Sequence, residues 1–139
     1  MRLKEQRLWD SMKRHAPKGF ILERIENVVK AGTPDVIVRF PGKPWRWVEL
    51  KSPASPKRAD TRLLGSEGLN KDQMNWHIKA ALSGGDNYVL IRDSDRNLYL
   101  IDCARLGIGV QLLNDMDSAQ LRNWSVAEDW HEIFEELAK

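Results

Sequence analysis

The stretch GTPDVIVRFPGKPWRWVELK, residues 32–51, decides the fold. Its first half is rich in β-branched residues, a turn with Pro41, Gly42 and Pro44 interrupts it, and strand character resumes over residues 45–51. Two apolar runs joined by a short connection rich in Pro and Gly are typical of an antiparallel β-hairpin. We therefore expect a hairpin here, and its register decides which side chains meet.

The register of this hairpin determines whether two acidic side chains share a face. Side chains alternate between the two faces of a strand, so Glu49 and Lys51 project from the same face. If the connection has an odd number of residues, Asp35 pairs opposite Glu49 on that face. An even number would put the two carboxylates on opposite faces, unless a bulge intervenes. An odd connection therefore brings two carboxylates and one amine together.

Hydrophobic periodicity and turn residues predict the other elements. Helices are expected over residues 3–15, 70–82 and 118–124 and after a capping box at 125–128, and strands over 20–25, 87–92 and 98–101. This order predicts a single α/β domain over residues 1–139, with a central mixed β-sheet flanked by α-helices. Its core is expected over about 3–102, and the extension 103–139 ends in an acidic amphipathic helix. Residues 52–69, which hold two prolines and two glycines, predict a long mobile loop.

Composition narrows the class of protein. The 139 residues carry a net charge of +2, no apolar run approaches the roughly 18 residues of a membrane span, and Cys103 is the single cysteine. The N-terminus lacks the apolar stretch of a signal peptide, so we expect a soluble cytoplasmic protein. The charge is uneven, with seven bases against two acids over 39–62 and seven acids against two bases over 115–139.

The patch of Asp35, Glu49 and Lys51 suits phosphodiester chemistry. Carboxylate oxygens favour a hard divalent cation such as Mg²⁺ or Mn²⁺. A lysine beside it could orient or deprotonate the attacking water, or stabilise the negative charge that develops on the phosphate. Pro34-Asp35 followed by Glu49-Leu50-Lys51 resembles the signature of the PD-(D/E)xK nuclease superfamily, which implies a restriction-endonuclease-like core.

More of the chain resembles the VRR-NUC-like branch of small phage and bacterial nucleases. The matching features are an acidic residue on the first helix (Glu5), Gly32-Thr33-Pro34-Asp35, Glu49-Leu50-Lys51, Gln73 with Trp76, and Gly84-Gly85 before a strand. The resemblance implies a DNA endonuclease, with Asp35 and Glu49 as metal ligands, the Leu50 carbonyl as a third, and Lys51 as catalytic. Gln73 would orient the catalytic groups or water. Glu5 would lie near the metal, and Glu23 and Glu26 are alternatives for this upstream acid.

Basic residues around the motifs are candidates for phosphate contacts. The candidates are Lys57, Arg58 and Arg62 in the loop and Arg39, Lys43 and Arg46 in the hairpin. Trp45 and Trp47 share a face with Glu49 and could stack on bases or pack under the site. A homodimer would suit cleavage of symmetric branched DNA such as a junction. The alternative to an enzyme is a catalytically silent nuclease fold that binds nucleic acid or protein.

Overall fold

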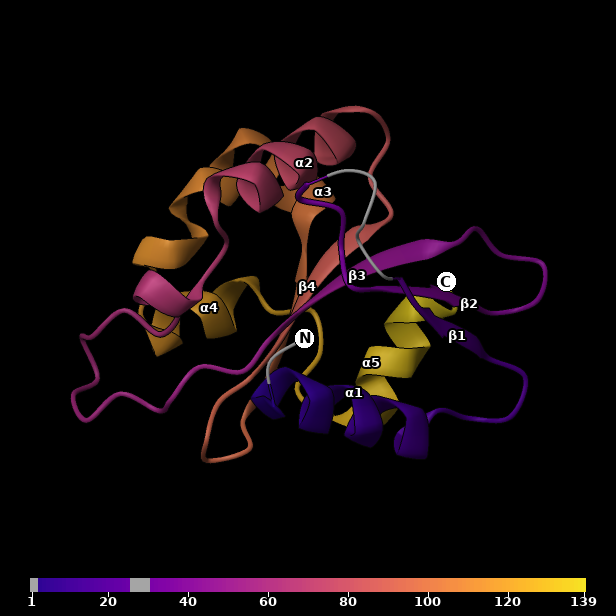
Figure 1. The fold of residues 1–139 in the computed structure, drawn as a ribbon, viewed down its shortest axis with the longest axis horizontal. Coiled ribbons are helices and arrows are strands. Elements are labelled where there is room, and N and C mark those ends of the chain that lie inside the picture. Colours follow the sequence, from indigo (N-terminus) through magenta and orange to yellow (C-terminus); the bar gives the residue numbers. More distant parts are fainter. Residues whose placement is uncertain (1–2, 26–30) are drawn as a thin grey trace.

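The structure, a computed structural model, describes residues 3–25 and 31–139 and contains a five-stranded sheet with helices on both faces (Figure 1). The strands are β1 (Ile21–Arg24), β2 (Val36–Arg39), β3 (Arg46–Lys51), β4 (Asn87–Arg92) and β5 (Leu98–Asp102). The helices are α1 (Leu3–His15), α2 (Lys71–Leu82), α3 (Cys103–Leu106), α4 (Ser118–Trp124) and α5 (Trp130–Leu137), with 3₁₀ helices η1 (Gly65–Glu67) and η2 (Gly107–Asp115). No helix of the described segments is long and apolar enough to cross a membrane.

The sheet is mixed, as the sequence predicts. Its strands lie in chain order, β1-β2-β3-β4-β5, and all neighbours pair antiparallel except β3 and β4, which are parallel. A parallel pair needs a crossover, and α2 supplies it. The carboxyl ends of β3 and β4 therefore meet at the same edge of the sheet.

The register of the β2–β3 hairpin follows the odd connection. Val36 lies opposite Val48, and Ile37 lies opposite Trp47. The same register continued by one residue places Asp35 opposite Glu49, with Gly42 at the centre of the connection. The condition set by the sequence for bringing the two carboxylates to one face is met.

Two apolar cores cover the two faces of the sheet. Helices α1 and α5 pack on one face, where Leu8, Met12 and Phe134 meet the β3 residue Leu50. Helix α2 and η2 cover the opposite face, so the helices form two layers around the sheet (Figure 1). Residues 103–139 contribute to both cores through Val110, Leu113 and Leu121 on one face and Ile133, Phe134 and Leu137 on the other. The extension is therefore built into the fold.

The segment 52–69 is a loop, as predicted, but its leucines anchor it in the core, so the mobility expected of it was wrong. Leu63, Leu64 and Leu69 are buried in the core beneath α2. The Leu63 amide donates to the Met116 carbonyl, and Leu69 exchanges two hydrogen bonds with the Asn114 side chain. These apolar residues are too irregularly spaced to show a strand or helix period, which is why the pattern suggested a loop.

Two further predictions about helices were wrong in detail. The last helix begins at Trp130 with Asp129 as its N-cap, whereas the Ser125 hydroxyl donates to the Ala127 carbonyl and accepts from the Leu100 amide. Ser125 thereby joins the chain to β5 and is the C-cap of α4, and it is not the N-cap of the last helix. The apolar spacing of α2 predicts Leu82 on the buried side of the helix, whereas Leu82 is 69% exposed and His77 is the fully buried residue.

Candidate active site

Side chains from β3, α2 and the segment before β2 meet at the end of β3. Lys51 Nζ donates to Gln73 Oε1 at 3.1 Å, and Gln73 Nε2 donates to Glu49 Oε2 at 3.3 Å. The Leu50 amide donates to Asp35 Oδ2 at 3.0 Å. The structure thus brings together four of the five site residues that the sequence predicts, although they are up to 38 positions apart in the chain.

The first turn of α2 fixes the position of Gln73. Asn70 caps the helix by accepting from the Gln73 amide at 2.9 Å, and Gln73 Oε1 accepts in return from the Asn70 amide at 3.0 Å. This reciprocal capping box holds the Gln73 side chain toward the helix N-terminus. The same Oε1 atom also accepts from Lys51 Nζ. Gln73 therefore serves both the helix cap and the contact between Lys51 and Glu49.

Gly32 allows the chain before Asp35 to pass close to the first turn of α2. Its φ is +89°, and a Cβ atom at this position would lie 2.3 Å from the Asp72 carbonyl oxygen. Both conditions admit only glycine without a shift of the backbone. The glycine of the Gly-x-Pro-Asp motif thus sets the spacing between the segment that carries Asp35 and the helix that carries Gln73.

Burial and like charge act on Glu49. Glu49 is 1% exposed, and its Oε1 atom has no hydrogen-bond partner. Burial raises the pKa of Glu49 well above its ordinary value, and the hydrogen bond to Asp35 and the Asp35 charge raise it further. Lys51 lowers the pKa of Glu49 and Glu5 raises it, both by their charge. The isolated protein thus holds a buried carboxyl group that is short of positive charge.

This arrangement fits a divalent cation bound through oxygen atoms. The described residues contain no group of three or more His, Cys, Asp or Glu side chains placed to hold a metal. The donors on the chain are the paired carboxyl groups of Asp35 and Glu49, and Glu49 Oε1 is buried without a partner. Hard cations take such oxygens and complete their coordination with water and substrate. Asp35 and Glu49 are therefore suited to hold the cation.

Of the two candidates for the upstream acid that lie within the described residues, Glu5 and Glu23, Glu5 is the one whose charge acts on Glu49. Glu5 lies in the first turn of α1 and is partly buried. Glu23 is exposed on β1, opposite Ile37. Glu26 lies outside the described residues. The electrostatic coupling favours the first-helix position.

The prediction that Arg46 contacts phosphate was wrong. Arg46 is 8% exposed, donates to the Tyr88 hydroxyl and to the Lys139 carbonyl, and pairs with Asp86 at 3.1 Å. It therefore joins β3 to the C-terminus inside the fold, because alternation on β3 points it to the face covered by α5.

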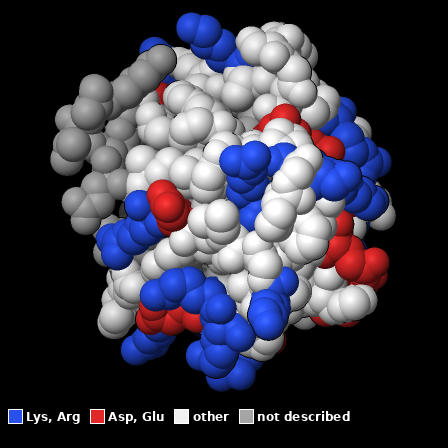
Figure 2. Space-filling model, turned by 90° about the vertical axis from the view of Figure 1, so that its right-hand side faces the viewer, with Lys and Arg blue, Asp and Glu red and all other residues white. Residues whose placement is uncertain are grey.

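The other predicted bases lie on the surface. Arg39 donates to the Lys43 carbonyl and lies over the Trp45 ring. Arg58 pairs with Asp60, and Arg62 pairs with Asp115. Figure 2, seen from the side of the β2–β3 turn, shows groups of Lys and Arg with acidic side chains between them. Lys43 and Lys57 are exposed as well.

His77 and Asn87 form a buried polar pair beneath the site that the sequence did not reveal. Asn87 Nδ2 lies 2.9 Å from His77 Nδ1 and donates to the His77 carbonyl at 3.1 Å. His77 Nε2 and Asn87 Oδ1 are buried without partners. Trp76, the next residue of α2, packs against Trp47 of β3 with ring centroids 5.4 Å apart. The His77–Asn87 pair joins α2 to β4. The contact between Trp76 and Trp47 supports a packing role for Trp47.

His77 is expected to contribute a loss of stability in weak acid. Burial, and then the Lys51 charge, lower the pKa of His77 from 6.5 to about 4. Below pH ~6.5 His77 is protonated in the unfolded chain, whereas in the folded chain it stays neutral down to pH ~4. As the pH falls through this window, His77 therefore lowers the free energy of unfolding by up to ~3 kcal/mol. In urea unfolding across this range, the wild type should lose stability relative to His77→Gln as the pH falls. Equal pH dependence in the wild type and this variant would contradict it, and His131→Gln, at an exposed histidine, is the control.

Comparisons with known proteins show a likeness to solved structures but none to a family model or a curated sequence. No family model matches the chain, and no curated protein matches its sequence. Among solved structures, the chain is similar to Hjc of Archaeoglobus fulgidus, a Holliday junction resolvase from an archaeal hyperthermophile. The TM-score is 0.56 at 16% sequence identity, over 97% of this chain and 98% of that one. The chain shares the fold of this resolvase. The predicted restriction-endonuclease-like α/β fold is thereby confirmed.

Proposed function

We propose that the chain is a metal-dependent endonuclease that hydrolyses phosphodiester bonds of DNA and selects branched structures such as four-way junctions. The observation that carries the proposal is the Lys51–Gln73–Glu49 bridge beside Asp35 at the end of β3. The likeness to a Holliday junction resolvase supports DNA as the substrate class. Within the nucleases, we propose the VRR-NUC-like branch, because the spacing of the motifs along the chain resembles it.

The residues of the chain have separate roles in this proposal. Asp35 and Glu49 hold Mg²⁺ or Mn²⁺, which, when bound, acidifies water and offsets charge on the phosphate. In an extended strand the amide and carbonyl of one residue point to the same side, so the Leu50 carbonyl faces Asp35, as its amide does. This supports the Leu50 carbonyl as a third ligand.

Lys51 acts on the phosphate or on the attacking water. Lys51 is 7% exposed, and its amine donates a hydrogen bond to Gln73 Oε1. The amine is therefore a positive charge held in a fixed position at the end of β3. A charge fixed before the reaction stabilises a transition state without reorganisation. Gln73 positions the amine, and Glu5 stands near the cation on the side of α1. Lys57, Arg58, Arg62, Arg39 and Lys43 remain proposed contacts to DNA.

A panel of four-way junction, flap, single-stranded and linear duplex DNA tests the proposal. The wild type is expected to cut the junction in Mg²⁺ or Mn²⁺, to lose activity in EDTA, and to lose it in Asp35→Asn. A mass measurement in solution tests the proposed homodimer, since two sites related by a two-fold axis suit symmetric cleavage. Absence of cleavage of every substrate, with DNA binding retained, would point instead to a catalytically silent binding module.

A further inference from the structure

A cavity of about 500 Å³ lies at the sheet edge where the parallel strands β3 and β4 end. It is bounded by α1, by the segment after β3 that starts at Ser52, and by the β4–β5 turn. Ligand sites of sheets with parallel strands favour this edge. Five bases line the cavity, which we call the basic cleft: Lys4, Arg7, Arg14, Arg92 and Arg96.

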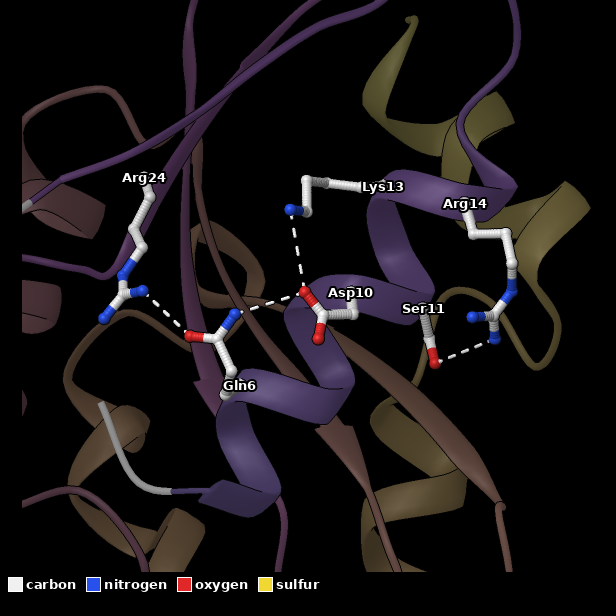
Figure 3. Close-up of polar contacts among 6 residues, drawn as sticks. All are labelled: Gln6, Asp10, Ser11, Lys13, Arg14 and Arg24. Atoms are coloured by element: carbon white, nitrogen blue, oxygen red, sulfur yellow. Dashed lines mark hydrogen bonds and ion pairs between the residues drawn. The ribbon is translucent and has the colours of Figure 1, made fainter.

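The two acids of the basic cleft are already engaged by neighbouring groups. Asp10 pairs with Lys13 at 3.6 Å and accepts from Gln6 Nε2 at 3.1 Å, on α1 (Figure 3). Asp93 accepts from the Asp95 and Asn97 amides and from the Asn97 side chain within its own turn. Neither carboxylate pairs with a base of the cleft among the described residues. The cleft therefore keeps an excess of positive charge.

Two guanidinium groups of the basic cleft are held by one neutral hydroxyl. Arg92 donates to Ser11 Oγ at 2.8 Å, and Arg14 donates to the same atom at 3.3 Å. Figure 3 shows Arg14 turned toward Ser11 and away from the contacts that link Arg24, Gln6 and Asp10. Burial lowers the pKa of Arg92, and the charges of Arg96 and Arg14 lower it further. Gathering these charges without an acid is unfavourable unless an anion joins them.

None of the ion pairs found within residues 3–25 and 31–139 uses these five bases. Planar guanidinium groups bind phosphate through two parallel hydrogen bonds, and several of them side by side match consecutive phosphates of one strand. The chemistry of the basic cleft therefore fits a polyanion with phosphate groups.

The basic cleft continues from the candidate active site. Lys51 is the last residue of β3, and Ser52, the next residue, lines the cleft and donates to the Lys4 carbonyl at 3.3 Å. A second cavity of about 310 Å³ shares Lys4 and Ser52 with the cleft and is also lined by Glu5. This second cavity is therefore lined by an acid whose charge acts on Glu49.

We propose that the basic cleft binds backbone phosphates of the DNA strand next to the phosphate that is cut. This inference rests on the proposed function, because it takes the scissile phosphate to lie at Glu49 and Lys51. It assigns the main binding surface to α1 and the β4–β5 turn, on residues far in the chain from the basic segment 39–62.

The test measures binding of a labelled four-way junction in EDTA, where cleavage is excluded, between about 50 and about 200 mM salt. Arg7→Gln/Arg96→Gln should weaken binding about tenfold and reduce the slope of log affinity against log salt by ~1.8, at ~0.9 for each phosphate contact. The control Lys18→Gln/Lys79→Gln removes the same charge from exposed positions outside the cleft. Its affinity should stay within about twofold of the wild type, the small change expected for removing bulk charge alone.

A second part of the experiment adds inorganic phosphate at constant ionic strength. It distinguishes binding of a DNA strand in the basic cleft from binding of a free phosphate ion. The inference is overturned if the cleft variant and the control bind the junction alike, or if inorganic phosphate binds the cleft while the variant keeps full affinity for DNA. Loss of binding in the cleft variant, with no cleavage by the wild type in Mg²⁺ or Mn²⁺, would support the cleft and contradict the proposed activity. Cleavage by the wild type, with equal binding of the junction by the cleft variant and the control, would support the proposed activity and contradict the role of the basic cleft.

Discussion

Glu49→Gln is expected to reduce DNA cleavage by at least ~10²-fold, the scale for losing one preorganised electrostatic group, while making the metal-free protein more stable. Glu49 is buried, one of its oxygens has no partner, and it lies beside Asp35. Glutamine keeps the shape, can accept from Gln73, and can donate to Asp35. Removing the unsatisfied group should raise the free energy of unfolding by about 1–3 kcal/mol.

The gain in stability from Glu49→Gln is expected to grow with pH. The folded-state pKa of Glu49 is raised, so the folded protein binds a proton at pH values where the unfolded chain has released it. Ionisation of Glu49 therefore lowers the stability of the wild type relative to the glutamine variant as the pH rises from about 4.5 through the raised pKa of Glu49. Divalent cations should restore this loss in the wild type alone.

Urea unfolding between weakly acid and weakly alkaline pH, with and without Mg²⁺, measures both effects. Glu23→Gln is the matched control, since it removes one carboxylate from an exposed position on β1. A Glu49→Gln protein that is less stable than the wild type at alkaline pH in EDTA would contradict the inference that the buried Glu49 carboxylate destabilises the metal-free protein. Unchanged cleavage would remove Glu49 from the active site.

Local sequence rules were sufficient where one element decides the outcome. The β-branched run before Pro41 and the alternation after Trp45 predict the hairpin, and the parity of its connection predicts that Asp35 meets Glu49. Asn70 predicts the start of α2 because capping depends on neighbouring residues. Gln73 was found through a resemblance, and the structure supplies its physical reason, a side chain shared between the helix cap and Lys51.

Contacts between distant segments were beyond such rules. Arg46 has the charge and the hairpin position of a DNA contact. Its contacts with Tyr88, Asp86 and the Lys139 carbonyl, all distant in the chain, hold it inside the fold. The basic cleft joins Arg14 of α1 to Arg92 of β4, which are 78 positions apart, through a serine with no motif. The charge count over 39–62 therefore drew attention to one segment, while the densest unpaired bases lie on two others.

Gly32→Ala is expected to lower both stability and cleavage, and Gly42→Ala separates the causes. Both glycines have positive φ, +89° and +82°, and a Cβ atom at Gly42 would meet nothing within 4 Å. Gly42→Ala should therefore show the conformational cost alone, about 1–2 kcal/mol, with cleavage unchanged. Gly32→Ala adds a clash with the Asp72 carbonyl, so its loss should reach about 3 kcal/mol or more.

The effect of Gly32→Ala on cleavage follows from the position of Gln73. A shift of the first turn of α2 moves the side chain that holds Lys51 against Glu49, and a displacement of about 1 Å can cost ~10²-fold in rate. Cleavage of the preferred substrate is measured where both variants are folded, as judged by urea unfolding, and junction binding in EDTA should stay at the wild-type level. If the two alanine variants lose equal stability and cut equally fast, the close approach of Gly32 to α2 does not set the geometry of the site.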